Sequence, residues 1–166
     1  AGIEPDIVTV GKGLGGGVPP APLCATEAVS VFEHGEQGGT FNGSPLMTAV
    51  GSAVLDVMLA PGFLDGVAAR GRYLAAGLGQ LVTTCGLSHE GGWGLLRALD
   101  LGKDVAAAVV AYARDNLEKH EGWDGEGLLV NAPRPNLLRF MPALDVTEAE
   151  IDRMLNGVRI ALEAVG

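Results

Sequence analysis

The feature that most limits the fold of this chain is a glycine-rich loop between a short apolar segment and a cluster of prolines. Residues 6–10 read Asp-Ile-Val-Thr-Val, and Lys12 follows among the five glycines of residues 11–17. A short β-branched segment with almost no charge is typical of a strand covered on both faces. The glycines allow positive φ angles and leave space for a flat, bulky group beside the lysine amine. We therefore expect a strand, a loop and an amine that is placed to bind an aldehyde.

The same loop also matches a fingerprint of nucleotide-binding proteins. Residues 11–16 fit G-x-G-x-x-G after a strand. That fingerprint requires a helix to begin at the last glycine, so that its amide groups hold a pyrophosphate. Pro19, Pro20 and Pro22 follow instead, and prolines so close together are incompatible with an ordinary helix. A P-loop also fails, because Lys12 is followed by glycine. We reject both interpretations, and a titration with NAD or ATP would test this.

Composition narrows the class of protein further. The chain has 166 residues, of which 48% are hydrophobic and 26 are glycine, which indicates a globular α/β protein with a real core. Its net charge of −9, without a basic stripe, argues against nucleic acid as a partner. We find no membrane-span or signal-peptide pattern. Cys24 and Cys85 lack metal or redox spacing, so we expect reduced thiols in a cytoplasmic protein and no metal site.

The spacing of apolar residues predicts the remaining elements. A helix should follow the Ser44-Pro45 pair and end before Pro61-Gly62, because serine caps helices and proline suits the first turn. Three more helices are expected at residues 64–82, at residues 103–119 and after the capping box Thr147–Glu150. Strands are expected at residues 95–101, 127–131 and 137–144. Residues 89–94 are interpreted as a turn, and residues 120–127 as an exposed acidic loop.

Arg139 is the second candidate site residue, since it is embedded in the apolar run of residues 137–144. A buried guanidinium without a partner is costly. A substrate carboxylate is a suitable partner, because the guanidinium fork binds both of its oxygens. A structural ion pair with an acidic or main-chain group is the alternative.

Three segments together resemble the class III (ω-type) aminotransferases, which use pyridoxal 5'-phosphate. They are Pro5-Asp6-Ile7 through Lys12-Gly13-Leu14-Gly15-Gly16-Gly17, then residues 38–46 (Gly-Gly-Thr-Phe-Asn-Gly-Ser-Pro-Leu), and residues 137–144 (Leu-Leu-Arg-Phe-Met-Pro-Ala-Leu). The resemblance covers nearly the whole chain. It implies an α/β fold of the type I pyridoxal-phosphate transferases, with the end of the large cofactor domain and a connecting helix at residues 1–59. The small α+β domain would occupy residues 60–166.

The resemblance also implies roles for individual residues. Lys12 would be the catalytic lysine that forms a Schiff base with the cofactor. Thr40 would contact the phosphate of a cofactor held by the other subunit of a homodimer. Arg139 would bind the substrate α-carboxylate. Ser44, where the family usually has asparagine, would lie at the substrate site and also cap the helix.

Within the family, the chain most resembles the acetylornithine aminotransferases, which move an amino group from N-acetylornithine to 2-oxoglutarate in arginine biosynthesis. Ornithine, 4-aminobutyrate and succinyl-diaminopimelate aminotransferases and an aminomutase share these motifs. A non-catalytic dimerisation domain is the alternative of another class.

The family's aspartate for the pyridine nitrogen, its stacking aromatic residue and its phosphate-binding helix would all lie upstream of Ala1. We therefore expect a C-terminal fragment that is inactive alone. The strand at residues 6–10 should then be disordered or swapped into a neighbouring chain, because its sheet is largely absent.

Overall fold

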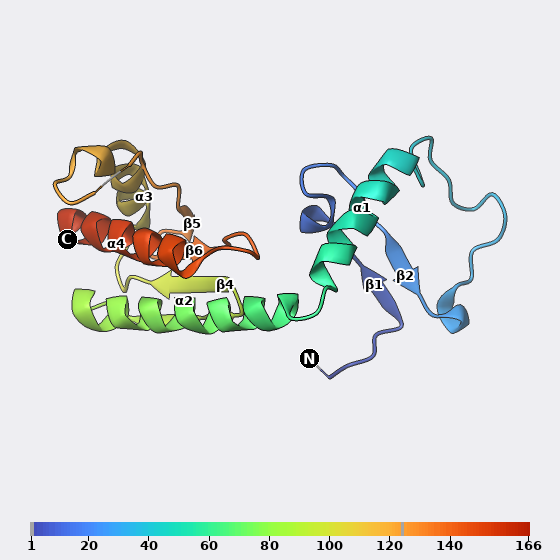
Figure 1. Cartoon of the computed structure of the whole chain (residues 1–166), viewed down its shortest axis with the longest axis horizontal. Coiled ribbons are helices and arrows are strands. Elements are labelled where there is room, and N and C mark those ends of the chain that lie inside the picture. Colours follow the sequence, from blue (N-terminus) through green and yellow to red (C-terminus); the bar gives the residue numbers. More distant parts are fainter. Residues whose placement is uncertain (1, 124) are drawn as a thin grey trace. The chain divides into compact units, whose positions relative to one another are not determined.

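A computed structural model describes residues 2–123 and 125–166, and it combines helices with two antiparallel sheets (Figure 1). The chain divides into two compact units, residues 1–63 and residues 64–166, which we call unit 1 and unit 2. Each unit is described by itself. No single helix of the described residues is both long and apolar enough to cross a membrane.

Unit 1 is built around a two-stranded ribbon. Its elements are β1 (Ile7–Thr9), the 3-10 helix η1 (Lys12–Gly15), β2 (Leu23–Ala25), the 3-10 helix η2 (Glu27–Val29) and α1 (Pro45–Met58). The strands are antiparallel, with Val8 opposite Cys24. The expectation of a strand without a partner in its own chain was wrong. The proline cluster turns the chain back along β1, and Val10 N donates to Pro22 O at 3.0 Å.

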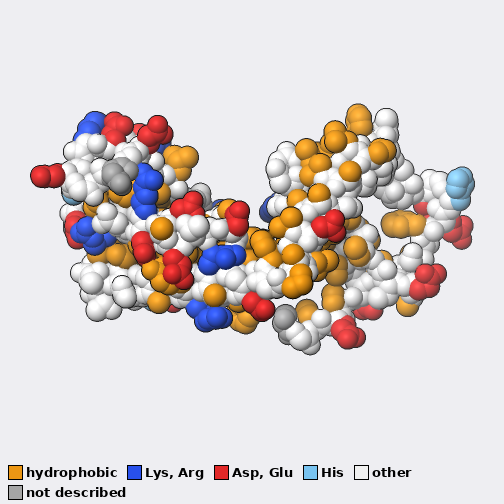
Figure 2. Space-filling model, in the orientation of Figure 1, with side chains coloured by type: hydrophobic (Ala, Val, Ile, Leu, Met, Phe, Trp, Pro, Cys, Tyr) orange, Lys and Arg blue, Asp and Glu red, His pale blue; other side chains and the backbone are white. Residues whose placement is uncertain are grey.

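The expected burial of β1 on both faces is also not seen in this chain. Every residue of β1 and β2 is exposed, because the ribbon has no further strand beside it among the described residues of unit 1. Helix α1 begins at Pro45 as predicted and packs against η1, where Leu14 is 8% exposed. The rest of α1 carries many exposed hydrophobic side chains, which Figure 2 shows spread over this helix.

Unit 2 is a four-stranded antiparallel sheet with helices on one face. Its strand order is β3-β4-β6-β5, and the elements run α2 (Phe63–Cys85), β3 (His89–Trp93), β4 (Leu96–Asp100), α3 (Ala106–Asp115), the 3-10 helix η3 (Leu117–Lys119), β5 (Asn131–Arg134), β6 (Leu137–Phe140) and α4 (Glu148–Val165). Figure 1 shows α2, α3 and α4 gathered beside the strands. The capping box at Thr147 and Glu150 is confirmed, and it starts α4.

The prediction of a turn at residues 89–94 was wrong, because residues 89–93 form strand β3. Its two glycines suggested a turn, but Gly91 and Gly92 pair with Ala98 and Arg97 of β4. Gly92 has a φ of +134°, and a Cβ there would lie 2.2 Å from Leu96 O. Glycine is therefore needed for a close approach inside the hairpin.

The two faces of the unit 2 sheet differ in burial. Leu99 of β4 and Leu138 of β6 are fully buried, and they belong to one core with Leu74, Leu78 and Val158 from the helices. On the alternate face, Trp93, Leu96 and Arg139 are exposed. A sheet with one covered face and one open face is common among antiparallel sheets. The open face is where Arg139 lies.

Candidate active site

Lys12 has an unusual backbone conformation. Its φ is +51°, and it is the one non-glycine residue with a positive φ among residues 2–123 and 125–166. Left-handed φ angles are uncommon for residues with a Cβ, and such strain gathers at functional sites. The turn around it is tightly constrained, because a Cβ on Gly15 would lie 2.3 Å from Pro20 Cδ. The loop thus holds Lys12 in a conformation that the sequence alone would not favour.

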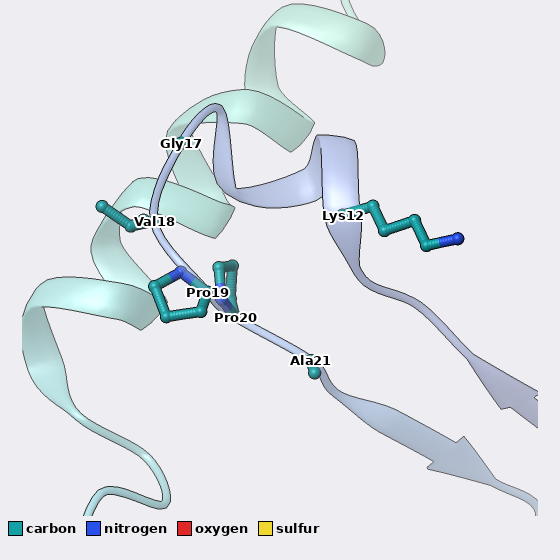
Figure 3. Close-up of a pocket in the computed structure, with 6 residues that line it drawn as sticks. All are labelled: Lys12, Gly17, Val18, Pro19, Pro20 and Ala21. Carbon is teal, nitrogen blue, oxygen red and sulfur yellow. The ribbon is translucent and has the colours of Figure 1, made fainter.

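A pocket of about 340 Å³ lies beside Lys12 and is lined by Lys12, Gly17, Val18, Pro19, Pro20 and Ala21. Figure 3 shows the lysine side chain leaving η1 and extending away from Val18, Pro19 and Pro20. The lysine is exposed, and it is the one charged side chain among the described residues that line the pocket. The amine is therefore accessible, and the other residues that line the pocket are apolar or glycine.

The chain has three lysines, and their amines differ in hydrogen bonding. Lys103 Nζ donates to Gly166 O at 3.0 Å, and Lys119 Nζ donates to Asp115 O at 3.1 Å. Lys12 Nζ donates to no group of the described residues. It is therefore the lysine whose amine is most available to an aldehyde.

These residues fit pyridoxal phosphate in part. The free amine of Lys12 suits the aldehyde carbon, and the glycines leave open space for a ring. No arginine, hydroxyl or amide side chain lines the Lys12 pocket, so this part of the site supplies no side-chain ligand for a phosphate. The residues of this pocket therefore fit covalent attachment of the cofactor through Lys12. Groups outside this pocket would have to bind the phosphate.

Thr40 and Ser44 lie on the segment that leads into α1. Thr40 is exposed at the start of a turn that a backbone bond closes, from Asn42 N to Gly39 O at 3.1 Å. Its hydroxyl has no hydrogen bond to the described residues, so the turn does not depend on it. Ser44 occupies the N-cap position of α1 without a side-chain cap bond. Neither residue lines the Lys12 pocket.

Arg139 lies on the open face of the unit 2 sheet, in β6. The expectation of a buried arginine was wrong: the burial of β6 alternates, and Arg139 points to the exposed side between buried Leu138 and Phe140. Its guanidinium forms no ion pair or side-chain hydrogen bond with the described residues. It is therefore free to bind an anion, which is the chemistry predicted for it.

A second pocket of about 340 Å³ adjoins Arg139. Its lining is mostly apolar, with Asn131 and Glu150 as further polar members, and comprises Leu129, Val130, Asn131, Arg139, Phe140, Met141, Pro142, Val146, Glu150, Ile151 and Met154. The Glu150 carboxylate is engaged elsewhere, because it accepts from Thr147 N at 2.7 Å and Thr147 Oγ1 at 2.8 Å. These bonds lower the pKa of Glu150 below its ordinary value. Among the described residues that line this pocket, Arg139 is thus the one cation.

Sequence reasoning missed one ion pair. Arg97 of β4 pairs with Glu90 of β3, and its Nη1 donates to Gly92 O at 2.9 Å. Both residues are largely buried, and Arg97 Nε has no partner. An arginine between Leu95 and Leu99 on the buried face was a signal that a carboxylate must lie across the hairpin. The pair fixes the hairpin. Arg134 of β5 and Arg139 of β6 are the arginines of the sheet that form no ion pair or side-chain hydrogen bond with the described residues.

Comparison with known proteins shows the family to which the chain belongs. The family model described as aminotransferase class-III matches residues 1–162. The chain belongs to the class III aminotransferase family. Acetylornithine aminotransferase of Ralstonia nicotianae is 56% identical over 164 residues, which are 99% of this chain and 39% of that protein. Acetylornithine aminotransferase 2 of Bordetella parapertussis is 54% identical over 98% of this chain and 39% of its own length.

Solved structures share the fold over the whole chain. Acetylornithine aminotransferase from Elizabethkingia anophelis matches with a TM-score of 0.81 at 25% identity, over 98% of this chain and 40% of that one. An (S)-enantioselective omega-transaminase from Thermomicrobium roseum matches with a TM-score of 0.80 at 25% identity, over 99% of this chain and 38% of that one. The fold is that of class III, pyridoxal-phosphate-dependent aminotransferases. The chain spans about two fifths of the length of these relatives.

Proposed function

We propose that this chain carries part of the active site of an aminotransferase that uses pyridoxal phosphate and moves an amino group from N-acetylornithine to 2-oxoglutarate. The observation that supports this most is Lys12, a free amine at positive φ inside the family's glycine-rich motif. Relatives over half identical to the chain carry the name acetylornithine aminotransferase. Arginine biosynthesis in the cytoplasm is the corresponding role.

In this proposal Lys12 acts twice. Its Nζ would hold the cofactor through the aldehyde carbon when no substrate is bound. When it is not attached to the cofactor, Nζ would accept a proton from the substrate carbon as general base and would donate a proton as general acid later in the reaction. When bound, the cofactor supplies the electron sink that makes this proton transfer feasible. The left-handed backbone of Lys12 presents the amine away from the proline wall (Figure 3).

Arg139, Thr40 and Ser44 are the other residues to which we assign a role in the reaction. Arg139 binds the substrate α-carboxylate, which its free guanidinium and lack of an acidic partner support. Ser44 contacts the substrate, and the unengaged hydroxyl of Thr40 binds the cofactor phosphate of the partner subunit in a homodimer. That assignment supplies a phosphate ligand which the Lys12 pocket lacks.

We expect the isolated 166 residues to show no transaminase turnover. The Lys12 pocket offers no side-chain ligand for the phosphate, and a cofactor attached through its aldehyde alone is poorly oriented. Turnover by this chain alone, with N-acetylornithine and 2-oxoglutarate, would contradict this expectation.

Borohydride trapping tests the role of Lys12. The chain is incubated with limiting pyridoxal phosphate, reduced and analysed by peptide mass spectrometry, which reports each of the three lysines separately. Labelling should favour Lys12 over Lys103 and Lys119, whose amines donate hydrogen bonds. Lys12→Ala should remove most of the label, whereas Lys103→Ala and Lys119→Ala are matched controls that should not. Equal labelling of all three lysines would refute the proposal.

A further inference from the structure

The open face of the unit 2 sheet places side chains in three rows around Arg139. In the central row, Gly91, Ala98, Arg139 and Asn131 lie side by side across the four strands. In the next row toward the β3–β4 turn, Trp93 pairs with Leu96. In the row on the other side, His89 pairs with Asp100, Asp100 with Leu137, and Leu137 with Arg134 of β5. The face is therefore polar at one end and apolar at the other, with the arginine between them.

On one side of Arg139, the central row carries only small side chains. These are Gly91 and Ala98, so the surface beside the guanidinium is nearly flat and lies below the neighbouring side chains; we call this surface the floor. Trp93 rises at one end of that floor and is 86% exposed, with Leu96 at 55% and Met141 at 59%. Strand spacing places the Cα atoms of Trp93 and Arg139 roughly 12 Å apart. Both long side chains can therefore approach one small ligand lying on the floor.

The charges of this face favour an anion at its centre. Asp100 is held at the polar end by Asn136 Nδ2 at 3.0 Å and Gly102 N at 2.9 Å, and forms no ion pair with Arg139. Glu150 is held by Thr147. Arg139 and, in the polar row, Arg134 are exposed and form no ion pair with the described residues. In a chain of net charge −9, they make this face suitable for a carboxylate from outside.

We infer that Trp93 is a specificity-determining residue, which contacts the carbon chain of the carboxylate that Arg139 binds. Leu96 and Met141 complete the apolar wall on which that chain rests. The inference rests on the proposed role of Arg139 and adds to it the direction in which the substrate extends, from the guanidinium over Gly91 and Ala98 toward the indole. The indole of Trp93 offers a large apolar ring on which a carbon chain can rest.

Nuclear magnetic resonance of the 15N-labelled chain can test this, because its two tryptophans give separate indole signals that Trp93→Phe assigns. Acetate and pentanoate are the probes, since they share a carboxylate and differ in chain length. Pentanoate should bind about tenfold more tightly, if its three added carbons are half buried. It should shift the Trp93 indole signal. Trp123 packs inside unit 2 against Arg153, so its signal is the internal control.

Two variants separate the possible outcomes. Trp93→Ala should leave acetate binding unchanged and remove the tenfold advantage of pentanoate, whereas Arg139→Met should abolish the binding of both. Both side chains are exposed, and an unchanged Trp123 signal confirms that each variant is folded. Equal affinities for the two acids, or an advantage of pentanoate that survives Trp93→Ala, would overturn the inference alone. Absence of acetate binding would overturn it together with the proposed role of Arg139, whereas the labelling of Lys12 is measured independently.

Discussion

Units 1 and 2 belong to one family match but bury their apolar residues very differently. Unit 2 contains a continuous core in which Leu74, Leu99, Leu138 and Val158 are fully buried. Among the described residues of unit 1, Leu14 is the one hydrophobic side chain classed as buried. Large side chains are exposed there instead: Ile3, Ile7, Val8, Val10, Leu23, Val31, Phe32, Phe41, Leu46, Leu55, Val57 and Leu59.

The proposed site residues are divided between the two units. Arg139 lies on a sheet whose other face is anchored in the core of unit 2. Lys12 and Thr40 lie on loops of unit 1, where little apolar area is buried in this chain. Because hydrophobic burial is the main favourable contribution to folding, the carboxylate site should be preformed. The lysine loop should depend on further contacts for its stability.

Separate expression of the units should give the largest contrast. Residues 64–166 should fold alone and unfold cooperatively in urea, because the core lies entirely within them. Residues 1–63 should show no cooperative transition, because a two-stranded ribbon with one helix buries too little area. Far-UV circular dichroism against urea measures both. A cooperative transition in residues 1–63 would show that their exposed side chains find partners within the unit.

Truncation of one large side chain in each unit should show the same difference in the free energy of unfolding. Leu99→Ala in β4 removes a fully buried side chain and should lower the free energy of unfolding by about 2–5 kcal/mol. Phe41→Ala removes a larger side chain that is 87% exposed and should change it by less than about 0.5 kcal/mol. Urea titrations of the whole chain measure both values. A cost for Phe41→Ala that approaches that of Leu99→Ala would mean that unit 1 has a core.

Much of unit 2 and the start of α1 could be predicted from the sequence. Ser44-Pro45 and the capping box of Thr147 and Glu150 mark helix starts through local chemistry, and both starts were predicted within a residue. The alternation that exposes Arg139 between Leu138 and Phe140 was not predicted, because the residues on both sides of it are apolar. Its apolar neighbours suggested burial, because the sequence does not show whether both faces of a strand are covered.

Features that depend on close backbone approach could not be predicted. Gly91 and Gly92 read as a turn, since glycines are frequent in turns, yet the hairpin needs a residue without a Cβ at position 92. The antiparallel partner of β1 was missed for a similar reason. Residues 19–22 look like a break in the sequence, but in space they return the chain to pair with β1. The positive φ of Lys12 likewise follows from the turn as a whole.

Alanine substitutions at two helical glycines should change the free energy of unfolding in opposite directions, one in each unit. A Cβ on Gly71 of α2 would lie 2.8 Å from the backbone carbon of Gly94, so Gly71→Ala should destabilise by about 1–3 kcal/mol. A Cβ on Gly51 of α1 would meet Leu14 and Pro20 at 3.9 Å, an ordinary contact. Gly51→Ala should therefore stabilise α1 by about 0.5–1 kcal/mol, through helix propensity. Thermal unfolding followed at 222 nm distinguishes the signs. Destabilisation by Gly51→Ala would indicate tighter packing in unit 1 than its exposed surface suggests.

Removal of the two helix-capping side chains, Ser44 and Thr147, should give the smallest difference in the free energy of unfolding. That difference should depend on pH. Thr147→Ala removes a hydroxyl that accepts from Glu150 N at 3.2 Å and should cost about 1 kcal/mol, whereas Ser44→Ala should cost less, because Ser44 makes no side-chain cap bond.

Bonds from Thr147 N and Oγ1 hold the pKa of Glu150 below its ordinary value. A depressed carboxyl pKa adds stability above the unfolded-state pKa, and this contribution is lost as the pH falls through the folded-state pKa. The difference between the wild-type chain and Thr147→Ala should therefore be largest above about pH 5 and shrink below about pH 4, near the range where glutamate is protonated. Urea midpoints from pH 3 to pH 7 measure it, with Ser44→Ala as the control. A gap that stays constant with pH would mean that Glu150 contributes to the cap without its charge.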